Sequence, residues 1–248
     1  MRRFFIEQKI NDTQNLEITG QPAHHIRNVL RFKKNDTIIL FDGTGFDYKA
    51  KINNISNTSI QTTIFEKYFS KTEPPIKITL AQAMLKEKKM DTLIRQATEL
   101  GISQWIPFIC ERTIPKPNKN KMSSKIKRWQ KISSEAAKQC KRSQLLEINN
   151  LITFSQLMAL NKSDLKILFW EKSSHLLDEQ KNKPENILLV LGPEGGFSPE
   201  EVEMAKINSF IITSLGPRIL KAETATISAC TLVQYIFGDM GKNFLDKL

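Results

Sequence analysis

The sequence has few of the residues on which disulfide frameworks and metal sites depend. Its 248 residues include 3 cysteines and 3 histidines. Cys110, Cys140 and Cys230 form an odd, scattered set without a Cys-x-x-Cys pair, which predicts reduced thiols in a cytoplasmic protein. Because no Cys/His ligand spacing occurs, we expect no metal site.

Long apolar runs are also missing. The longest unbroken aliphatic run, Ile187–Leu191, is too short to cross a bilayer. The start of the chain is basic, but Glu7 and Lys9 interrupt any apolar region of a signal peptide. We therefore expect neither a membrane-bound nor an exported protein.

Acidic residues are outnumbered by basic ones, and the excess is concentrated in one part of the chain. Lys and Arg total 37, Asp and Glu total 26, and the net charge is +11. Residues 1–73 carry a net charge of +3, residues 76–145 of +11 and residues 146–248 of −3. Segregated positive charge indicates a face for a polyanion, with nucleic acid first. A lysine-rich solvated surface is the alternative.

Up to about residue 73 the pattern predicts short strands. Thr37–Phe41 and Asp47–Ile52 flank Asp42-Gly43-Thr44-Gly45, which is a hairpin turn signal. Ser59–Phe65 alternates between apolar and polar residues as a further strand does. Together these segments predict a small β-barrel domain over residues 1–73.

A short helix and a linker complete this half of the chain. The helix is expected over residues 21–31, with Ile26, Val29 and Leu30 as its buried positions. Thr72–Pro75 ends in two prolines, which favour an extended, stiff connection.

From residue 76 to residue 248 strands and helices alternate. This pattern predicts an α/β domain with a mainly parallel sheet that helices cover on both faces. The expected strands are residues 76–84, 102–109, 165–170, 187–191 and 210–215, and the expected helices are residues 89–100, 121–142 and 222–237.

The most informative stretch is the glycine-rich turn within Leu191–Glu201. A buried strand ends there and a helix begins, with Ser198 as N-cap, Pro199 at the first helical position and Glu201 closing a capping box. The spacing matches neither a Walker A loop nor a dinucleotide fingerprint. Since Glu194 would repel phosphate, a cationic or neutral ligand fits better, and a tight turn without a ligand is the alternative.

A second strand end of the same kind lies at Leu215–Ala225. It begins with Gly216-Pro217 and leads through a short loop into the last helix. In α/β sheets ligands bind beyond the carboxyl ends of the strands, so two such loops predict a pocket.

With both loops in place, the sequence resembles the RsmE family of small-subunit (16S) ribosomal RNA uridine-N3 methyltransferases, within the SPOUT superfamily. The matching stretches follow the family's order along nearly the whole chain, at residues 2–5, 24–31, 89–101, 128–129, 135–142, 191–198 and 215–225. One departure is Lys221, where the family usually has arginine. Lysine keeps the charge but loses any bidentate contact.

The resemblance implies an architecture and a cofactor. It implies an N-terminal PUA-like RNA-binding barrel and a C-terminal SPOUT domain with a trefoil knot, acting as a homodimer with S-adenosylmethionine. Three strand-end loops would form the cofactor pocket. The cofactor-binding residues would be Trp170, Glu171, Leu191, Gly192, Glu194, Gly195, Gly196, Leu215, Gly216, Ile219 and Leu220.

The resemblance also implies the reaction, which is methylation of N3 of a uridine in 16S rRNA or in the assembled small subunit. N3 carries a proton at neutral pH, so the site must position N3, remove that proton and stabilise the negative charge that develops. The implied catalytic residues are Arg218, Lys221 and Arg142 as cations and Glu223 as a candidate base. Arg142 is expected on one helix face with Glu135 and Gln139. For Glu223, starting the final helix is the alternative role.

RNA would be held by basic residues from both halves of the chain, mostly through its phosphates. These residues would be Arg2, Arg3, His25, Arg27, Arg31, Lys121, Lys125, Arg128, Lys138 and Lys141. Two other functions stay open on the same fold. One is a non-catalytic RNA-binding or ribosome-assembly factor, and the other is a SPOUT enzyme that acts on a different RNA or on ribose.

Overall fold

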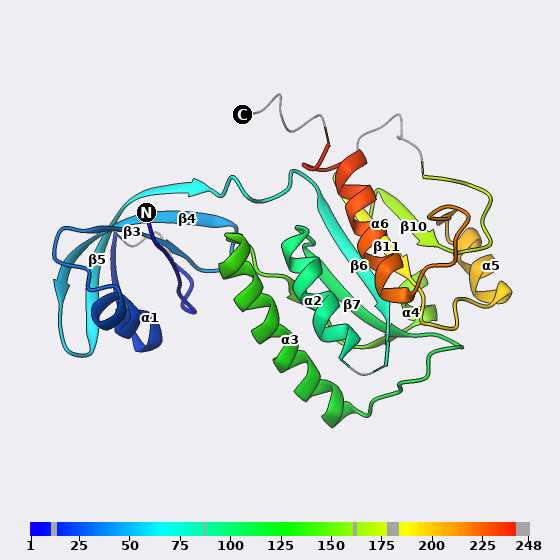
Figure 1. Ribbon diagram of the computed structural model, residues 1–248, viewed down its shortest axis with the longest axis horizontal. Coiled ribbons are helices and arrows are strands. Elements are labelled where there is room, and N and C mark those ends of the chain that lie inside the picture. The colour runs from blue at the N-terminus through cyan, green and yellow to red at the C-terminus, as the bar shows by residue number, and fades with distance from the viewer. Residues whose placement is uncertain (11–13, 87, 161–162, 178–183, 242–248) are drawn as a thin grey trace. The chain divides into compact units, whose positions relative to one another are not determined.

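The chain forms two compact units, which Figure 1 shows in a computed structural model. The structure describes residues 1–10, 14–86, 88–160, 163–177 and 184–241. The first unit is Met1–Glu73 with Ala137–Leu145, and the second is Pro74–Ala136 with Leu146–Leu248. Residues 137–145 therefore pack with the N-terminal strands. Within the described ranges, no helix has the length and apolar character needed to cross a membrane.

The first unit is built on a five-stranded sheet with the order β1-β3-β4-β5-β2. Its elements are β1 (Arg3–Phe5), β2 (Asn15–Thr19), α1 (Gly20–His24), the π-helix η1 (His25–Val29), β3 (Thr37–Phe41), β4 (Phe46–Ile55) and β5 (Ser59–Phe69). The predicted hairpin is confirmed, because β3 and β4 pair antiparallel across the turn. The strands β1 and β2 were not predicted, since with 3 and 5 residues they are too short for an alternation of apolar and polar residues to be decisive.

The helix predicted over residues 21–31 forms, but its second half is a π-helix. The backbone N–H of Leu30 donates to the carbonyl of His25 at 3.0 Å, which is an i to i+5 hydrogen bond. This wider turn changes which side chains face the core. Ile26 is fully buried as predicted, whereas Val29 is 60% exposed, so the prediction for Val29 was wrong.

The predicted linker at Thr72–Pro75 contains a buried anchor. The carboxylate of Glu73 accepts hydrogen bonds from the backbone N–H groups of Ser143 at 2.7 Å and Gln144 at 2.8 Å. It also pairs with the guanidinium of Arg142 at 3.0 Å. Because a buried carboxylate needs such partners, Glu73 fixes residues 142–144 to the first unit and is not a solvated linker residue.

The second unit contains a seven-stranded sheet in which the recorded strand pairs are all parallel. The strands run in the order β12-β10-β11-β6-β7-β8, and β9 pairs with β7. The strands are β6 (Lys77–Ala83), β7 (Gln104–Ile109), β8 (Glu147–Ile148), β9 (Ile152–Thr153), β10 (Leu165–Phe169), β11 (Asn186–Leu191) and β12 (Ile211–Thr213). The helices are α2 (Lys89–Glu99), α3 (Lys119–Cys140), α4 (Phe154–Met158), α5 (Pro199–Ile207) and α6 (Ala222–Ile236).

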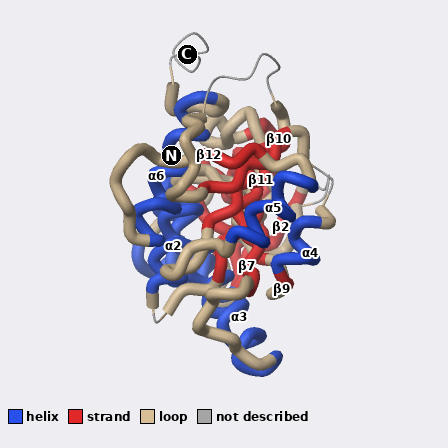
Figure 2. The backbone as a smooth tube through the Cα atoms, turned by 90° about the vertical axis from the view of Figure 1, so that its right-hand side faces the viewer, coloured by secondary structure: helices blue, strands red, loops and turns tan. Residues whose placement is uncertain are grey.

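Helices cover both faces of this sheet, as predicted. Figure 2 shows α2, α3 and α6 on one side and α4 and α5 on the other. One apolar core lies on the α2, α3 and α6 side and includes Trp105 and Trp129, and a second core around Phe108 and Phe197 lies on the α4 and α5 side. The α/β fold class is thereby confirmed, and the trefoil knot stays a prediction.

Candidate functional site

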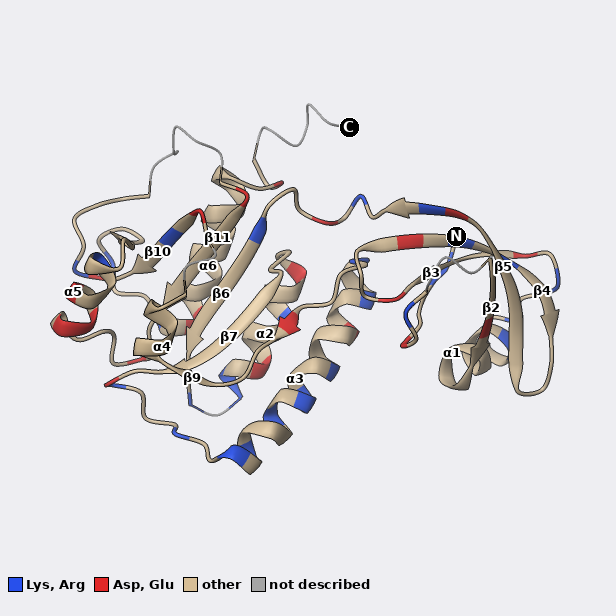
Figure 3. Ribbon diagram, turned by 180° about the vertical axis from the view of Figure 1, so that it is seen from behind, with Lys and Arg blue, Asp and Glu red and all other residues tan. Residues whose placement is uncertain are grey.

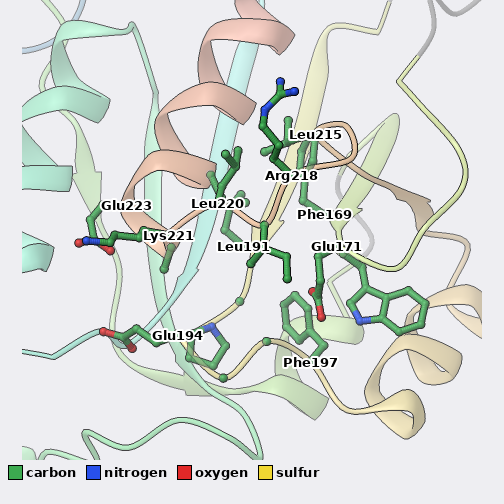
Figure 4. Close-up of a pocket in the computed structure, with 18 of the residues that line it drawn as sticks. Phe169, Glu171, Leu191, Glu194, Phe197, Leu215, Arg218, Leu220, Lys221 and Glu223 are labelled. Atoms are coloured by element: carbon green, nitrogen blue, oxygen red, sulfur yellow. The ribbon is translucent and has the colours of Figure 1, made fainter.

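The cavity of the second unit lies at the carboxyl ends of neighbouring strands. Strands β12, β10 and β11 are adjacent and parallel, so the loops that follow them meet at one edge of the sheet. These loops and the start of α6 surround a cavity of about 600 Å³ (Figure 4). That volume lies within the range of small-molecule sites.

The structure brings the predicted cofactor-binding residues and most of the predicted catalytic residues to this cavity. Every residue predicted to bind the cofactor lines it, and so do Arg218, Lys221 and Glu223. The remaining lining residues are Lys89, Phe169, Pro193, Phe197, Ala222 and Ala225. The two strand-end loops therefore share one cavity, whereas their roles in binding stay predictions.

Two glycines at the cavity, one in each strand-end loop, have a backbone shape that other residues adopt only under strain. Gly196 has φ +66° and Gly216 has φ +97°, both in the left-handed region. The backbone N–H of Gly196 donates to the carbonyl of Pro193 at 3.0 Å and closes the turn. A Cβ atom on Gly196 would lie 3.4 Å from both carboxylate oxygens of Glu171, so glycine keeps the loop close to that carboxylate.

The end of the glycine turn is fixed by the predicted capping box. The side chain of Ser198 accepts from the backbone N–H of Glu201, and the carboxylate of Glu201 accepts from the backbone N–H of Ser198 at 3.0 Å. The other carboxylate oxygen of Glu201 accepts from the backbone N–H of Glu111 at 2.8 Å, which ties the start of α5 to the end of β7. These hydrogen bonds fix the position of the end of the glycine turn relative to the start of α5.

Gln82 joins the glycine loop to the last helix and was not predicted to belong to the site. This residue of β6 is fully buried. Its Nε2 donates to the carbonyl of Gly192 at 3.2 Å, and its Oε1 accepts from the hydroxyl of Thr226 on α6 at 2.6 Å. A polar residue within the apolar second half of β6 was the available signal, because buried polar groups need partners.

We expect Gln82→Leu to lower the free energy of unfolding by about 1–3 kcal/mol, because it leaves the Gly192 carbonyl and the Thr226 hydroxyl without this buried partner. Urea unfolding followed by circular dichroism measures the change. The matched control is Gln104→Leu, which changes a half-buried glutamine on β7 and should cost less. Equal losses for the two variants would contradict the assigned role of Gln82.

Lys89 lines the cavity, although nothing in the sequence placed it in the site. It begins α2, and its Nζ lies 3.1 Å from Glu194 Oε1 on the glycine loop and 3.3 Å from Glu223 Oε2 at the start of α6. The hydrogen bond to Glu194 is the main reason that the pKa of Lys89 is raised, and Glu223 adds to this effect. One cation therefore links a carboxylate of the glycine loop with a carboxylate of helix α6.

Glu194 is held as a carboxylate. Partial burial raises its pKa, but backbone N–H groups, including that of Lys86 at 3.3 Å, and the Lys89 ammonium more than offset this effect. The net result is a pKa of Glu194 below its usual value. A carboxylate with a lowered pKa is a weak proton acceptor, so Glu194 suits contact with a positively charged ligand better than base catalysis.

The candidate catalytic residues at the cavity come from the loop after β12 and from α6. Arg218 is exposed, and Figure 4 shows its guanidinium pointing away from Glu194 and the glycine loop. Lys221 is the N-cap residue of α6, and Glu223 lies in the first helical turn. Arg218 is therefore placed where a group from a second molecule can reach it, and Glu223 faces the cavity from the helix start.

Arg142 is not part of this constellation, and its expected position on a helix face was wrong. The helix α3 ends at Cys140 because Lys141 has φ +66°, so Arg142 follows the helix and does not share a face with Glu135 and Gln139. Its side chain is buried in the first unit and pairs with Glu73. This pairing gives Arg142 a structural role in its own chain.

Several of the residues predicted to bind RNA have partners within the chain. Arg3 pairs with Asp47 at 2.6 Å, Arg27 donates to the carbonyl of Ser56 at 2.7 Å, and Arg128 pairs with Asp91 at 2.5 Å. The exposed residues of the predicted set are Arg2, His25, Arg31, Lys121, Arg128, Lys138 and Lys141, and Lys125 is half-buried. Figure 3 shows that basic residues continue along α3.

Comparison with known proteins identifies the class to which this fold and site belong. A family model described as an RNA methyltransferase domain matches residues 72–234, and one described as an RNA methyltransferase PUA domain matches residues 18–65. The protein is thus an RNA methyltransferase by family. A Bacillus subtilis relative named ribosomal RNA small subunit methyltransferase E is 33% identical, with 95% of this chain and 96% of that protein covered. The chain belongs to the ribosomal RNA small subunit methyltransferase E family.

Two solved structures share the whole fold. The family member from Neisseria gonorrhoeae, solved with S-adenosylmethionine, has a TM-score of 0.82 and 27% identity, covering 96% of this chain and 99% of that one. A Legionella pneumophila protein, also solved with this cofactor, has a TM-score of 0.80 and 32% identity, covering 96% and 98%. The similarity therefore extends over both units.

Proposed function

We propose that the protein transfers a methyl group from S-adenosylmethionine to N3 of a uridine in the 16S rRNA of the small ribosomal subunit. The observation that carries this proposal is the single cavity formed by the loops after β10, β11 and β12. Membership of a family of small-subunit rRNA methyltransferases supplies the substrate class.

The residues around the cavity suit S-adenosylmethionine. Apolar walls formed by Leu191, Leu215 and Leu220 suit a flat adenine ring, and the glycine backbone allows close approach. The indole N–H of Trp170 is buried at the cavity without a hydrogen-bond partner among the described residues, so a ligand acceptor would satisfy it. The carboxylate of Glu171 suits a cationic or hydroxyl-bearing ligand.

When bound, S-adenosylmethionine supplies a methyl group on a positively charged sulfur. The protein's own residues would prepare the uridine. Arg218 and Lys221 would stabilise the negative charge that develops on the uracil carbonyls, and Glu223 would accept the N3 proton. Lys89 would balance the charges of Glu194 and Glu223, so that the two carboxylates can lie near one cavity.

The proposal includes partners that stay predictions. We propose 16S rRNA or the assembled small subunit as substrate, a homodimer as the active form and the cytoplasm as the location. The exposed basic residues of α3, Lys121 and Lys138 among them, would bind phosphates with little sequence preference. Recognition of one particular uridine would then depend on the shape of the RNA.

Mass spectrometry of rRNA nucleosides from a deletion strain tests this function. We expect the loss of one 3-methyluridine, restored by the wild-type chain. Isothermal titration of the purified protein with S-adenosylmethionine gives an independent result. A folded protein that binds no S-adenosylmethionine, in a strain whose rRNA is unchanged, would instead indicate the non-catalytic RNA-binding factor.

A further inference from the structure

One end of the hairpin formed by β4 and β5 carries large apolar side chains on an open surface. Phe65 and Phe69 are each 58% exposed. Strand β2 pairs with β5 only through Ser59–Thr63, whereas β4 pairs with it as far as Phe69. Among the described strands, this end of β5 therefore has β4 as its one partner. We call residues 46–49 and 65–69 the ribbon end.

The side chains of the ribbon end alternate in a way that puts aromatic rings and a cation on one face. Lys67 and Phe69 are two residues apart along β5, so they point to the same side of the strand, and Phe65 lies just before them at a register shift in the pairing with β4. Phe69 lies opposite Phe46, with ring centroids 5.7 Å apart in an edge-to-face arrangement. Lys67 lies opposite Tyr48.

Positive charge is held directly over these rings. The Nζ of Lys67 lies 4.9 Å from the centroid of Phe46 and 5.7 Å from that of Tyr48. Lys71 is exposed two residues beyond Phe69. Tyr48 itself is buried in the core of the first unit, so Phe46 and Phe69 continue its apolar face beyond the point where the core ends. Exposed aromatic rings interleaved with lysines suit unpaired nucleic acid.

We propose that the ribbon end is a stacking surface for unpaired nucleotides of the RNA substrate. Bases would stack on Phe65 and Phe69, and Lys67 would meet the backbone phosphate between them. The proposal rests on the proposed function, because a uridine whose N3 is methylated cannot be paired through that atom. The proposal takes the bases next to that uridine to be unpaired as well, because unpaired bases can leave the stack and lie on aromatic side chains.

The test measures the affinity for a short single-stranded oligouridylate by fluorescence anisotropy at several salt concentrations. We expect Phe65→Ala and Phe69→Ala each to weaken binding by about 5- to 100-fold without changing the salt dependence. Lys67→Gln should lower the slope of log affinity against log salt by about one. The double variant Phe65→Leu/Phe69→Leu keeps the apolar packing but removes the rings, so it should also bind weakly.

The control is Ile207→Ala, which removes an exposed apolar side chain at the end of α5 that does not line the cavity. Titration with S-adenosylmethionine should be unchanged in every variant, so a failure of the proposed function and a failure of the stacking surface can be told apart. Wild-type RNA affinity in the double variant Phe65→Leu/Phe69→Leu would overturn the proposal. So would a change in oligomeric mass in light scattering, because it would assign the rings to a protein contact.

Discussion

Arg218→Ala should lower kcat for methyl transfer by about 10²-fold, while the affinity for S-adenosylmethionine changes little. Arg218 lies at the cavity and is exposed, with its guanidinium directed away from the glycine loop (Figure 4). It is thus better placed to contact the RNA base than to hold the cofactor. Removing it takes away a cation from the negative charge that develops on the uracil. Single-turnover kinetics with radiolabelled S-adenosylmethionine measure the rate, and calorimetry measures the affinity.

Two further variants separate this effect from a general loss of positive charge. Arg95→Ala removes an exposed arginine of α2 that does not line the cavity, so kcat should stay near the wild-type value. Arg218→Lys keeps the positive charge but lacks the planar guanidinium, and it should recover part of the rate that Arg218→Ala loses. If Arg95→Ala and Arg218→Ala were equally slow, Arg218 would act only through the overall attraction of RNA.

The cavity could be predicted because its position follows from short-range patterns. The apolar runs that end at Leu191 and at Leu215 are typical of strands buried in a parallel sheet, and both are followed by glycine and proline. Parallel neighbours bring their carboxyl ends to one edge, so two separate loops in the sequence had to meet if the strands were adjacent. The resemblance to a family supplied the third loop, at Trp170 and Glu171.

The other features of the site depend on contacts that the spacing of residues along the sequence does not reveal. Gln82 lies in the apolar second half of β6, and nothing in the sequence indicates that Thr226 is its partner. Lys89 is the first residue of a helix, where its side chain could have faced solvent, and only the fold brings Glu194 and Glu223 to it. Arg142 was placed on α3 because its spacing continues the helix, but the helix stops at the left-handed residue before it.

Gly196→Val should weaken the binding of S-adenosylmethionine by about 10- to 100-fold. Valine in the left-handed region costs about 1–3 kcal/mol, and the loop can relieve this strain by moving away from the shape that binds the cofactor. The strain then lowers the affinity, by about tenfold for each 1.4 kcal/mol. The new side chain would also meet the Glu171 carboxylate, which is 3.4 Å from the position of the Cβ. Calorimetric titration with S-adenosylmethionine measures the loss.

The chain supplies a control with the same backbone conformation. Gly20 has φ +67°, almost equal to the +66° of Gly196, and a Cβ atom there would meet nothing within 4 Å. Gly20→Val therefore carries a similar backbone strain at a residue of the first unit that does not line the cavity, and should reduce stability without reducing cofactor affinity. A comparable loss of affinity in both variants would mean that global destabilisation, and not the shape of the glycine turn, weakens binding. Loss in Gly196→Val alone would assign the cofactor to the turn after β11.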